Sequence, residues 1–318
     1  MLTNQQNGEF IAEHGLPDRF SDLITKHYAP LVVWVANQQS PGKTLLVGIS
    51  GAQGTGKTTL ADYLRLALEV GFDWQVAVLS IDDFYLTRKE RTQLAQNTHP
   101  LLATRGVPGT HDLHMLATCI EQLKLLGAGV RLSLPRFDKA HDDRSDRAFW
   151  PAVTGPVDLI ILEGWCVGSA PEPDDALLSP INVLERDKDH DGSWRHYVND
   201  QLKGSYSRLF TQLDKLVFLQ ASNFESVYRW RQEQEEKLAV SNPEHSTSIM
   251  NTGQLAGFMQ YFERLTRANL ATLPVIADVV LELDEQHHCV RCKYAEGKYQ
   301  ASLGVTSASL HGQDRAGG

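Results

Sequence analysis

The chain has 318 residues and a formal net charge of −9, and apolar residues make up 42% of it. These values are typical of a folded globular protein and argue against a nucleic-acid binder, which usually carries a basic surplus. Residues 1–16 lack the pattern of a secretory signal, no apolar run is long enough to span a membrane, and the chain has 4 cysteines, so we expect a cytoplasmic protein.

The first part of the chain predicts a helical extension that precedes the first strand. Residues 1–16 are polar and predict a loosely held segment, whereas apolar residues between 17 and 35 recur at helical spacing. Pro30 lies within this run and predicts a break in the helix. The apolar run from Leu45 to Ile49 then predicts the first strand.

A glycine-rich loop follows that strand directly. Residues Gly51 to Thr58 read G-x-x-x-x-G-K-T, and a helical pattern follows them, so the loop has the context of a phosphate-binding loop. Its backbone N–H groups and the start of the helix favour phosphate. We expect Lys57 to reach the β- and γ-phosphates and Thr58 to bind Mg²⁺. The expected ATP-binding residues are Gly51, Ala52, Gln53, Gly54, Thr55, Gly56, Lys57, Thr58 and Thr59.

Strands and helices alternate along the rest of the chain. Continuous apolar runs predict buried strands at 76–81, 157–162, 216–220 and 275–283, with a short strand at 130–134. Periodic patterns predict helices at 113–126, 194–213, 224–240 and 255–270. Irregular stretches are predicted at 82–112 and 170–192, and a terminal hairpin at 288–292 and 294–302.

This alternation predicts a three-layer α/β/α fold of the P-loop NTPase type, with a mainly parallel sheet. We see no linker that separates two domains. We therefore expect a single domain over residues 1–303, which includes the helical extension at 1–43, and a disordered tail at 304–318.

Carboxylates follow two of the predicted strands. Asp82 and Asp83 come directly after one strand, and Glu163 follows another. In parallel α/β sheets, ligands bind beyond the carboxyl ends of the strands, so all three acids should open into the crevice of the phosphate loop. Either aspartate suits a base for an acceptor hydroxyl, and Glu163 suits Mg²⁺. In isolation, such acids are also ordinary turn residues or helix caps.

Two further segments contain candidate binding groups. The turn from Arg105 to Asp112 supplies a guanidinium and the imidazole of His111; Arg105 either binds a carboxylate or phosphate or pairs with a neighbouring acid. The segment that contains Asp138 is either a substrate loop or a solvated surface. Four arginines are candidates for contacting the phosphates: Arg144, Arg147, Arg229 and Arg231. Cys289 and Cys292 form a lone C-x-x-C, for which we favour a structural hairpin over a zinc site.

Several motifs together resemble the D-glycerate 3-kinase family of plants and fungi and its bacterial kinase-like relatives. They are the phosphate loop, Ser80 to Tyr85, the Arg105 to Asp112 turn, Leu134 to Lys139 and Leu162 to Trp165. The broader clan contains phosphoribulokinase, uridine kinase and pantothenate kinase. The resemblance implies that Asp82 is the base, that Glu163 lies on the metal side, and that Tyr85 and Arg105 line the substrate pocket.

The resemblance also implies an activity: transfer of a phosphoryl group from ATP to the hydroxyl of a small molecule, with D-glycerate the expected acceptor and Mg²⁺ the expected metal. We expect Asp82, Lys57 and Arg105 to be catalytic. The expected substrate-binding residues are Asp82, Asp83, Tyr85, Arg105, His111 and Asp138. A kinase of another metabolite and a nucleotide-dependent switch ATPase are the alternatives. The oligomeric state stays open.

Overall fold

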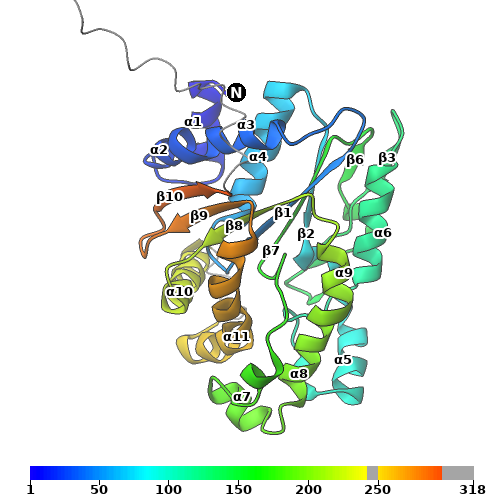
Figure 1. Cartoon of the computed structure of the whole chain (residues 1–318), viewed down its shortest axis with the longest axis vertical. Helices are drawn as coiled ribbons and strands as arrows, with labels where there is room; N and C mark the ends of the chain where they lie inside the picture. The colour runs from blue at the N-terminus through cyan, green and yellow to red at the C-terminus, as the bar shows by residue number, and fades with distance from the viewer. Residues whose placement is uncertain (242–249, 296–318) are drawn as a thin grey trace, which may run out of the picture.

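The computed structural model describes residues 1–241 and 250–295. The expected disordered tail at 304–318 and most of the expected strand at 294–302 lie outside these residues. Within them, the chain forms a central sheet that is covered by helices on both faces (Figure 1). The predicted three-layer fold is therefore confirmed.

The central sheet has 6 strands in the order β10-β9-β8-β1-β7-β2. All neighbouring strands are parallel except the last pair, β9 and β10. In chain order the strands are β1 (Leu45–Gly51), β2 (Val76–Ser80), β7 (Leu159–Gly164), β8 (Lys215–Gln220), β9 (Val279–Leu283) and β10 (Cys289–Tyr294).

The strand register brings the predicted functional ends together. Strand β7 lies between β1 and β2, with Glu163 opposite Ile49 on one side and opposite Ser80 on the other. The phosphate loop, Glu163 and the segment after Ser80 therefore leave the sheet at the same edge. The strand ends that the sequence predicted to meet are therefore adjacent, at the edge where ligands bind in parallel α/β sheets.

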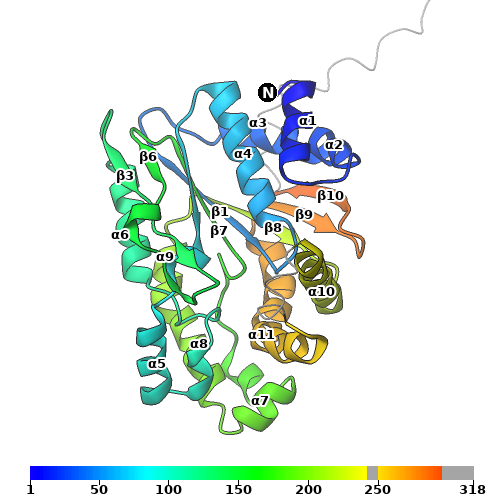
Figure 2. The same ribbon diagram turned by 180° about the vertical axis from the view of Figure 1, so that it is seen from behind.

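Alternate residues of the strands pack into two apolar cores, one on each face. Leu45, Val47 and Ile49 pack with α1 (Asn4–Glu13), α3 (Ala29–Ala36), α4 (Lys57–Phe72) and α10 (Phe224–Ser241). Leu46 and the alternate residues of β2, β7 and β8 pack on the other face with α6 (Leu113–Lys124), α9 (Ser207–Phe210) and α11 (Thr252–Ile276). Helix α11 contributes to both cores, and Figure 2 shows the arrangement from behind.

The expectation of a loosely held N-terminus was wrong. Helix α1 begins with a capping box between Thr3 and Gln6, and Phe10 and Ile11 are buried. The next helical run passes from α2 (Phe20–Leu23) through a π-helical turn into α3, so the chain does not break at Pro30. Proline is tolerated there because it lies in the first turn of α3.

The two stretches expected to be irregular contain helices. The first holds α5 (Arg88–Asn97), which starts with a capping box between Thr87 and Glu90, and the second holds α7 (Val183–Lys188). With α8 (Ser193–Gln201), these helices form a group at the end of the molecule opposite α1–α3 (Figure 1). A third, small apolar core lies under this group; it consists of Leu101, Leu102, Val107 and Trp194.

Other strand predictions need correction. The predicted strand at 130–134 is β3 (Arg131–Ser133), which pairs with β6 (Ala152–Thr154) in a separate two-stranded sheet. Strand β9 begins at Val279 instead of 275, because α11 continues to Ile276. Strands β9 and β10 form a C-terminal hairpin, whereas the expected pairing of 288–292 with 294–302 falls mostly outside the described residues.

Cys289 and Cys292 lie on β10, and residues 1–241 and 250–295 contain no cluster of three or more metal-binding side chains. In these same ranges, none of the helices has the length and apolar character needed to cross a membrane.

Candidate active site

The phosphate loop connects β1 to α4 in a conformation that requires glycine. Gly54 and Gly56 have φ angles of 79° and 88°, and a Cβ on Gly54 would lie 2.9 Å from Cβ of Trp230. Lys57 begins α4, and its Nζ donates to the carbonyl of Ala52 at 3.0 Å. Burial lowers the pKa of Lys57, and the nearby Glu163 and Asp82 oppose this shift. The loop therefore presents a half-buried cation beside the free N–H groups of a helix start.

Thr58 and Glu163 supply oxygen atoms next to the loop. The Thr58 hydroxyl donates to Oε1 of Glu163 at 3.4 Å, and Glu163 is buried at the end of β7. Burial raises the pKa of Glu163, whereas Lys57 and a hydrogen bond from Ser80 lower it. A hydroxyl and a carboxylate are hard oxygen donors, so this pair fits the preference of Mg²⁺.

Asp82 lies in a short 3₁₀ turn (Ile81–Phe84) that follows β2. Its carboxylate accepts hydrogen bonds from the Tyr85 hydroxyl at 2.7 Å and from Nζ of Lys139 at 2.8 Å. Burial raises the pKa of Asp82, but the charge and hydrogen bond of Lys139 and the hydrogen bond of Tyr85 outweigh it and lower the pKa to about 2. The carboxylate is therefore ionised at neutral pH.

Asp83 has a different environment from its neighbour. Its carboxylate accepts a hydrogen bond from the backbone N–H of Phe137 and another from Arg136, both at 3.1 Å. Burial raises its pKa against the influence of Arg136. Asp83 therefore anchors the segment at 136–137, whereas Asp82 faces Lys139.

The turn from Arg105 to Asp112, which we call the 105–112 turn, packs tightly against its neighbours. Gly106 has a φ of 133°, and a Cβ there would lie 2.7 Å from the ring of Phe262. The indole N–H of Trp165 donates to the carbonyl of Gly106 at 2.9 Å. Trp165 follows Glu163 by two positions, so the end of β7 holds this turn in place as well as supplying the carboxylate.

His111 is buried and keeps one ring nitrogen without a partner among the described residues. The backbone N–H of Gly109 donates to the Tyr206 hydroxyl at 2.9 Å, and that hydroxyl lies 2.6 Å from Nδ1 of His111. This network assigns a proton to Nε2, which has no hydrogen-bond partner. Burial lowers the pKa of His111 to about 4, so the ring is neutral at pH 7, and it stacks on Tyr85 at 4.6 Å.

Strands β4 (Phe137–Asp138) and β5 (Asp143–Arg144) form a small hairpin that we call the 136–144 hairpin. Arg105 pairs with Asp142 of the hairpin, donates to the carbonyl of Lys139 at 3.3 Å and lies over the ring of Phe137. Asp138 accepts hydrogen bonds from the N–H groups of Ala140 and His141, so it shapes the tip of the hairpin. Both predicted substrate residues therefore have protein partners within the 136–144 hairpin.

The candidate arginines separate into two groups. Arg144 pairs with Asp112 at 3.2 Å and lies beside the 105–112 turn, and Arg147 lies over the ring of Trp150. On α10, Arg229 pairs with Glu285 at 3.0 Å, and Arg231 pairs with Glu235. Only Arg144 among them contacts the predicted substrate-binding segments.

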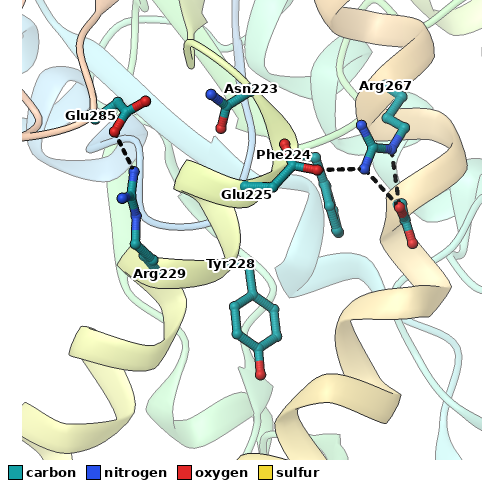
Figure 3. A pocket seen from close by; sticks show the side chains of 8 residues that line it. Asn223, Phe224, Glu225, Tyr228, Arg229, Arg267 and Glu285 are labelled. Atoms are coloured by element: carbon teal, nitrogen blue, oxygen red, sulfur yellow. Dashed lines mark hydrogen bonds and ion pairs between the residues drawn. The ribbon is translucent and has the colours of Figure 1, made fainter.

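Figure 3 shows the surface pocket in which Arg229 lies, at the start of α10. It has a volume of about 470 Å³, and ion pairs of Arg229 with Glu285 and of Arg267 with Glu225 flank it. None of the predicted catalytic or substrate residues lines this pocket.

Sequence reasoning missed some of the side chains that build the site. Tyr206 and Asp142 carried no motif, and Arg91 lay in a stretch expected to be irregular. Arg91 is buried and donates to the carbonyls of Leu86 and Ala103 as well as pairing with Asp142 at 2.9 Å. Lys139 belongs to the Leu134 to Lys139 motif, but the motif alone did not indicate that its ammonium group contacts Asp82. The 2.8 Å distance between Nζ of Lys139 and Oδ2 of Asp82 shows this contact.

Comparison with known proteins places the chain among kinases. No protein-family model matches it. The uncharacterized kinase mug58 of Schizosaccharomyces pombe is 36% identical over 216 residues, which are 65% of this chain and 76% of the relative. The chloroplastic D-glycerate 3-kinase of Arabidopsis thaliana is 29% identical over 78% of this chain, and the chain spans 54% of that enzyme's length.

A solved structure extends the likeness to the fold. The D-glycerate 3-kinase of Cryptococcus neoformans superposes with a TM-score of 0.69 at 26% identity, covering 86% of this chain and 99% of that one. The chain belongs to the D-glycerate 3-kinase family. Like its relatives in this family, it is a small-molecule kinase with a nucleotide-binding P-loop.

Proposed function

We propose that this kinase transfers the γ-phosphoryl group of ATP to D-glycerate and forms 3-phosphoglycerate. One observation carries the proposal: the half-buried Asp82, which is held by hydrogen bonds from Tyr85 and Lys139, interacts with the charge of Lys57 in the phosphate loop and with His111 in the 105–112 turn. The two named D-glycerate 3-kinases, one matched along most of this chain and one along its fold, support the choice of acceptor.

The geometry supports the following roles. ATP lies along residues 51–59, and Lys57 neutralises charge on the β- and γ-phosphates. The acceptor's O–H bond breaks and its proton passes to Asp82, while the oxygen forms a bond to Pγ. The bond between Pγ and the bridging oxygen breaks, and ADP leaves with that electron pair. Tyr85 orients Asp82 through its 2.7 Å hydrogen bond.

The acceptor's other groups need partners as well. Arg105 is a fork-shaped cation that suits the carboxylate of D-glycerate, and Nε2 of His111 is a buried donor that suits a hydroxyl or carboxylate oxygen. Asp83 and Asp138 shape this pocket through the backbone bonds described above. Mg²⁺, which Thr58 and Glu163 would hold, supplies positive charge to the phosphate oxygens when it is bound.

An acceptor panel tests the proposal. ADP release is measured with D-glycerate, L-glycerate, uridine and pantothenate, and with no acceptor, and ³¹P NMR identifies the phosphorylated position. We expect release that depends on D-glycerate and a 3-phosphate product. Robust turnover of uridine or pantothenate with none of D-glycerate would overturn the choice of acceptor. ADP release without any acceptor preference would favour a switch ATPase.

A further inference from the structure

The ammonium group of Lys139 lies where the phosphate loop and the 136–144 hairpin approach each other. Its Nζ is 2.8 Å from Oδ2 of Asp82, the other oxygen of which accepts the Tyr85 hydroxyl. The charge of Lys139 also acts on Lys57 and Glu163. A cation thus lies close to the proposed base, the phosphate-loop lysine and the metal-side carboxylate at once.

The hairpin does not need Lys139 to stay in place. Arg136 pairs with Asp83 from one end, and Arg144 pairs with Asp112 from the other. Both arginine side chains are largely buried, at 34% and 24% exposure, whereas the Lys139 side chain is 61% exposed. An exposed lysine–carboxylate pair contributes at most about 1 kcal/mol to stability. The arginines therefore fix the backbone and leave the lysine head free to change partner.

We propose that Lys139 is a second catalytic cation of the phosphoryl-transfer site, which pairs with Asp82 before reaction and binds the transferred phosphoryl group during it. This rests on the proposed function. As the acceptor's proton passes to Asp82, the carboxylate loses its charge and its hold on the ammonium. The oxygens of the phosphoryl group remain negative throughout the transfer, so they become the stronger partner.

The same contact makes a prediction for pH dependence. The titratable groups that interact with Asp82 besides Lys139 are Lys57, Asp83, Tyr85, His111, Glu163 and Cys166. Burial raises the pKa of Asp82, and Lys139 is the strongest influence that opposes burial. Loss of Lys139 should therefore raise the pKa of Asp82 and move the acid limb of kcat/KM to higher pH. The shift of that limb reports the contact between Lys139 and Asp82, and the fall in kcat described below reports the role of Lys139 toward the phosphoryl group.

The test compares Lys139→Met, Lys139→Arg and a matched control, Lys124→Met. Lys124 forms a similar pair, with Glu121 at 3.0 Å at the end of α6, away from the crevice. We expect Lys139→Met to lower kcat about 10²-fold, the usual loss when one charge-stabilising donor is removed. Lys139→Arg should restore most of the rate, and Lys124→Met should match the wild type. Calorimetry with a non-hydrolysable ATP analogue should show that the analogue still binds all three variants.

The outcomes separate this proposal from the choice of acceptor. A Lys139→Met variant with wild-type kcat and an unmoved acid limb would overturn the role of Lys139, and so would a change in acceptor KM alone. If the wild type phosphorylates another acceptor, the D-glycerate assignment fails and the comparison is made on that acceptor. If the wild type uses no acceptor, the rates of the wild type and of Lys139→Met are compared for hydrolysis of ATP by water. Equal rates of the two proteins would again contradict the proposal.

Discussion

On the nucleotide side of the crevice, one continuous segment, residues 45–72, supplies the strand, the loop, Lys57 and Thr58. On the acceptor side, Asp82 to Tyr85, the 105–112 turn and the 136–144 hairpin come from separate parts of the chain. Side-chain pairs such as Asp83 with Arg136 join them across 53 positions. Backbone geometry therefore defines the nucleotide side, whereas a network of charged side chains defines the acceptor side. Substitutions on the two sides should therefore have different effects on kcat and on acceptor KM.

The strongest expected effect separates the two adjacent aspartates of the acceptor side. Asp82→Asn removes the proposed base, so we expect kcat to fall about 10²- to 10⁴-fold while the ATP analogue still binds. Asp83→Asn is the matched control: it keeps an acceptor for the N–H of Phe137, and we expect less than about a tenfold loss. Steady-state kinetics on both variants shows which aspartate is the base. A larger loss of kcat in Asp83→Asn than in Asp82→Asn would mean that Asp83 is the base.

On the nucleotide side, Lys57→Met should lower kcat about 10²- to 10³-fold, because the lysine cation no longer neutralises charge that develops on the γ-phosphate. Acceptor KM should stay within about threefold, since Lys57 belongs to the loop and not to the acceptor pocket. Lys188→Met, an exposed lysine on α7, serves as the control for loss of a charge. If acceptor KM of Lys57→Met rises by the same factor as kcat falls, Lys57 also contributes to acceptor binding, and the nucleotide and acceptor sides do not act independently.

The same contrast explains what the sequence could predict. The phosphate loop and the strand-end acids are local: glycine spacing, a following helix and an apolar run before Glu163 are visible along the chain. The partners of His111 and Arg105 are not visible along the chain. Tyr206 lies 95 positions from His111, and Asp142 lies 37 positions from Arg105. Helices α1 and α5 carried capping boxes, so their omission reflects a signal that was overlooked.

A third prediction concerns His111 and the stability of the acceptor side. The pKa of His111 is about 4 in the folded protein because of burial, against about 6.5 for an exposed histidine. Between these values the unfolded chain binds a proton that the folded chain does not. Stability should therefore decrease as the pH falls from about 6.5 to 4, by about 3 kcal/mol in total for this group, and change no further below 4.

His111→Gln, which cannot titrate, isolates this contribution. Urea unfolding at several pH values gives the free energy of unfolding of each protein, and the difference between wild type and variant should change over that window. The contribution of ionised Asp82 to the free energy of unfolding is lost only as the pH falls from about 4 through about 2. It therefore does not overlap with the window of His111, between about pH 6.5 and 4. His114→Gln, a change on α6 outside this network, is the control. A pH-independent difference between the wild type and His111→Gln would mean that His111 has the same pKa in the folded and unfolded states, which would contradict its burial as a neutral ring.

The smallest expected effect tests whether Arg105 serves the acceptor or only the hairpin. Arg105→Lys keeps a positive charge but loses the planar fork, so bidentate binding of a carboxylate is lost while a pair with Asp142 remains possible. We expect acceptor KM to rise roughly tenfold with kcat little changed, because the fork positions the acceptor and takes no part in proton transfer. Arg208→Lys, at an exposed position of α9, is the matched control. If acceptor KM stays constant and only the free energy of unfolding falls, Arg105 is a tether for Asp142. The acceptor's carboxylate must then bind another cation, and Arg144, which pairs with Asp112 in the same turn, is the candidate to substitute next.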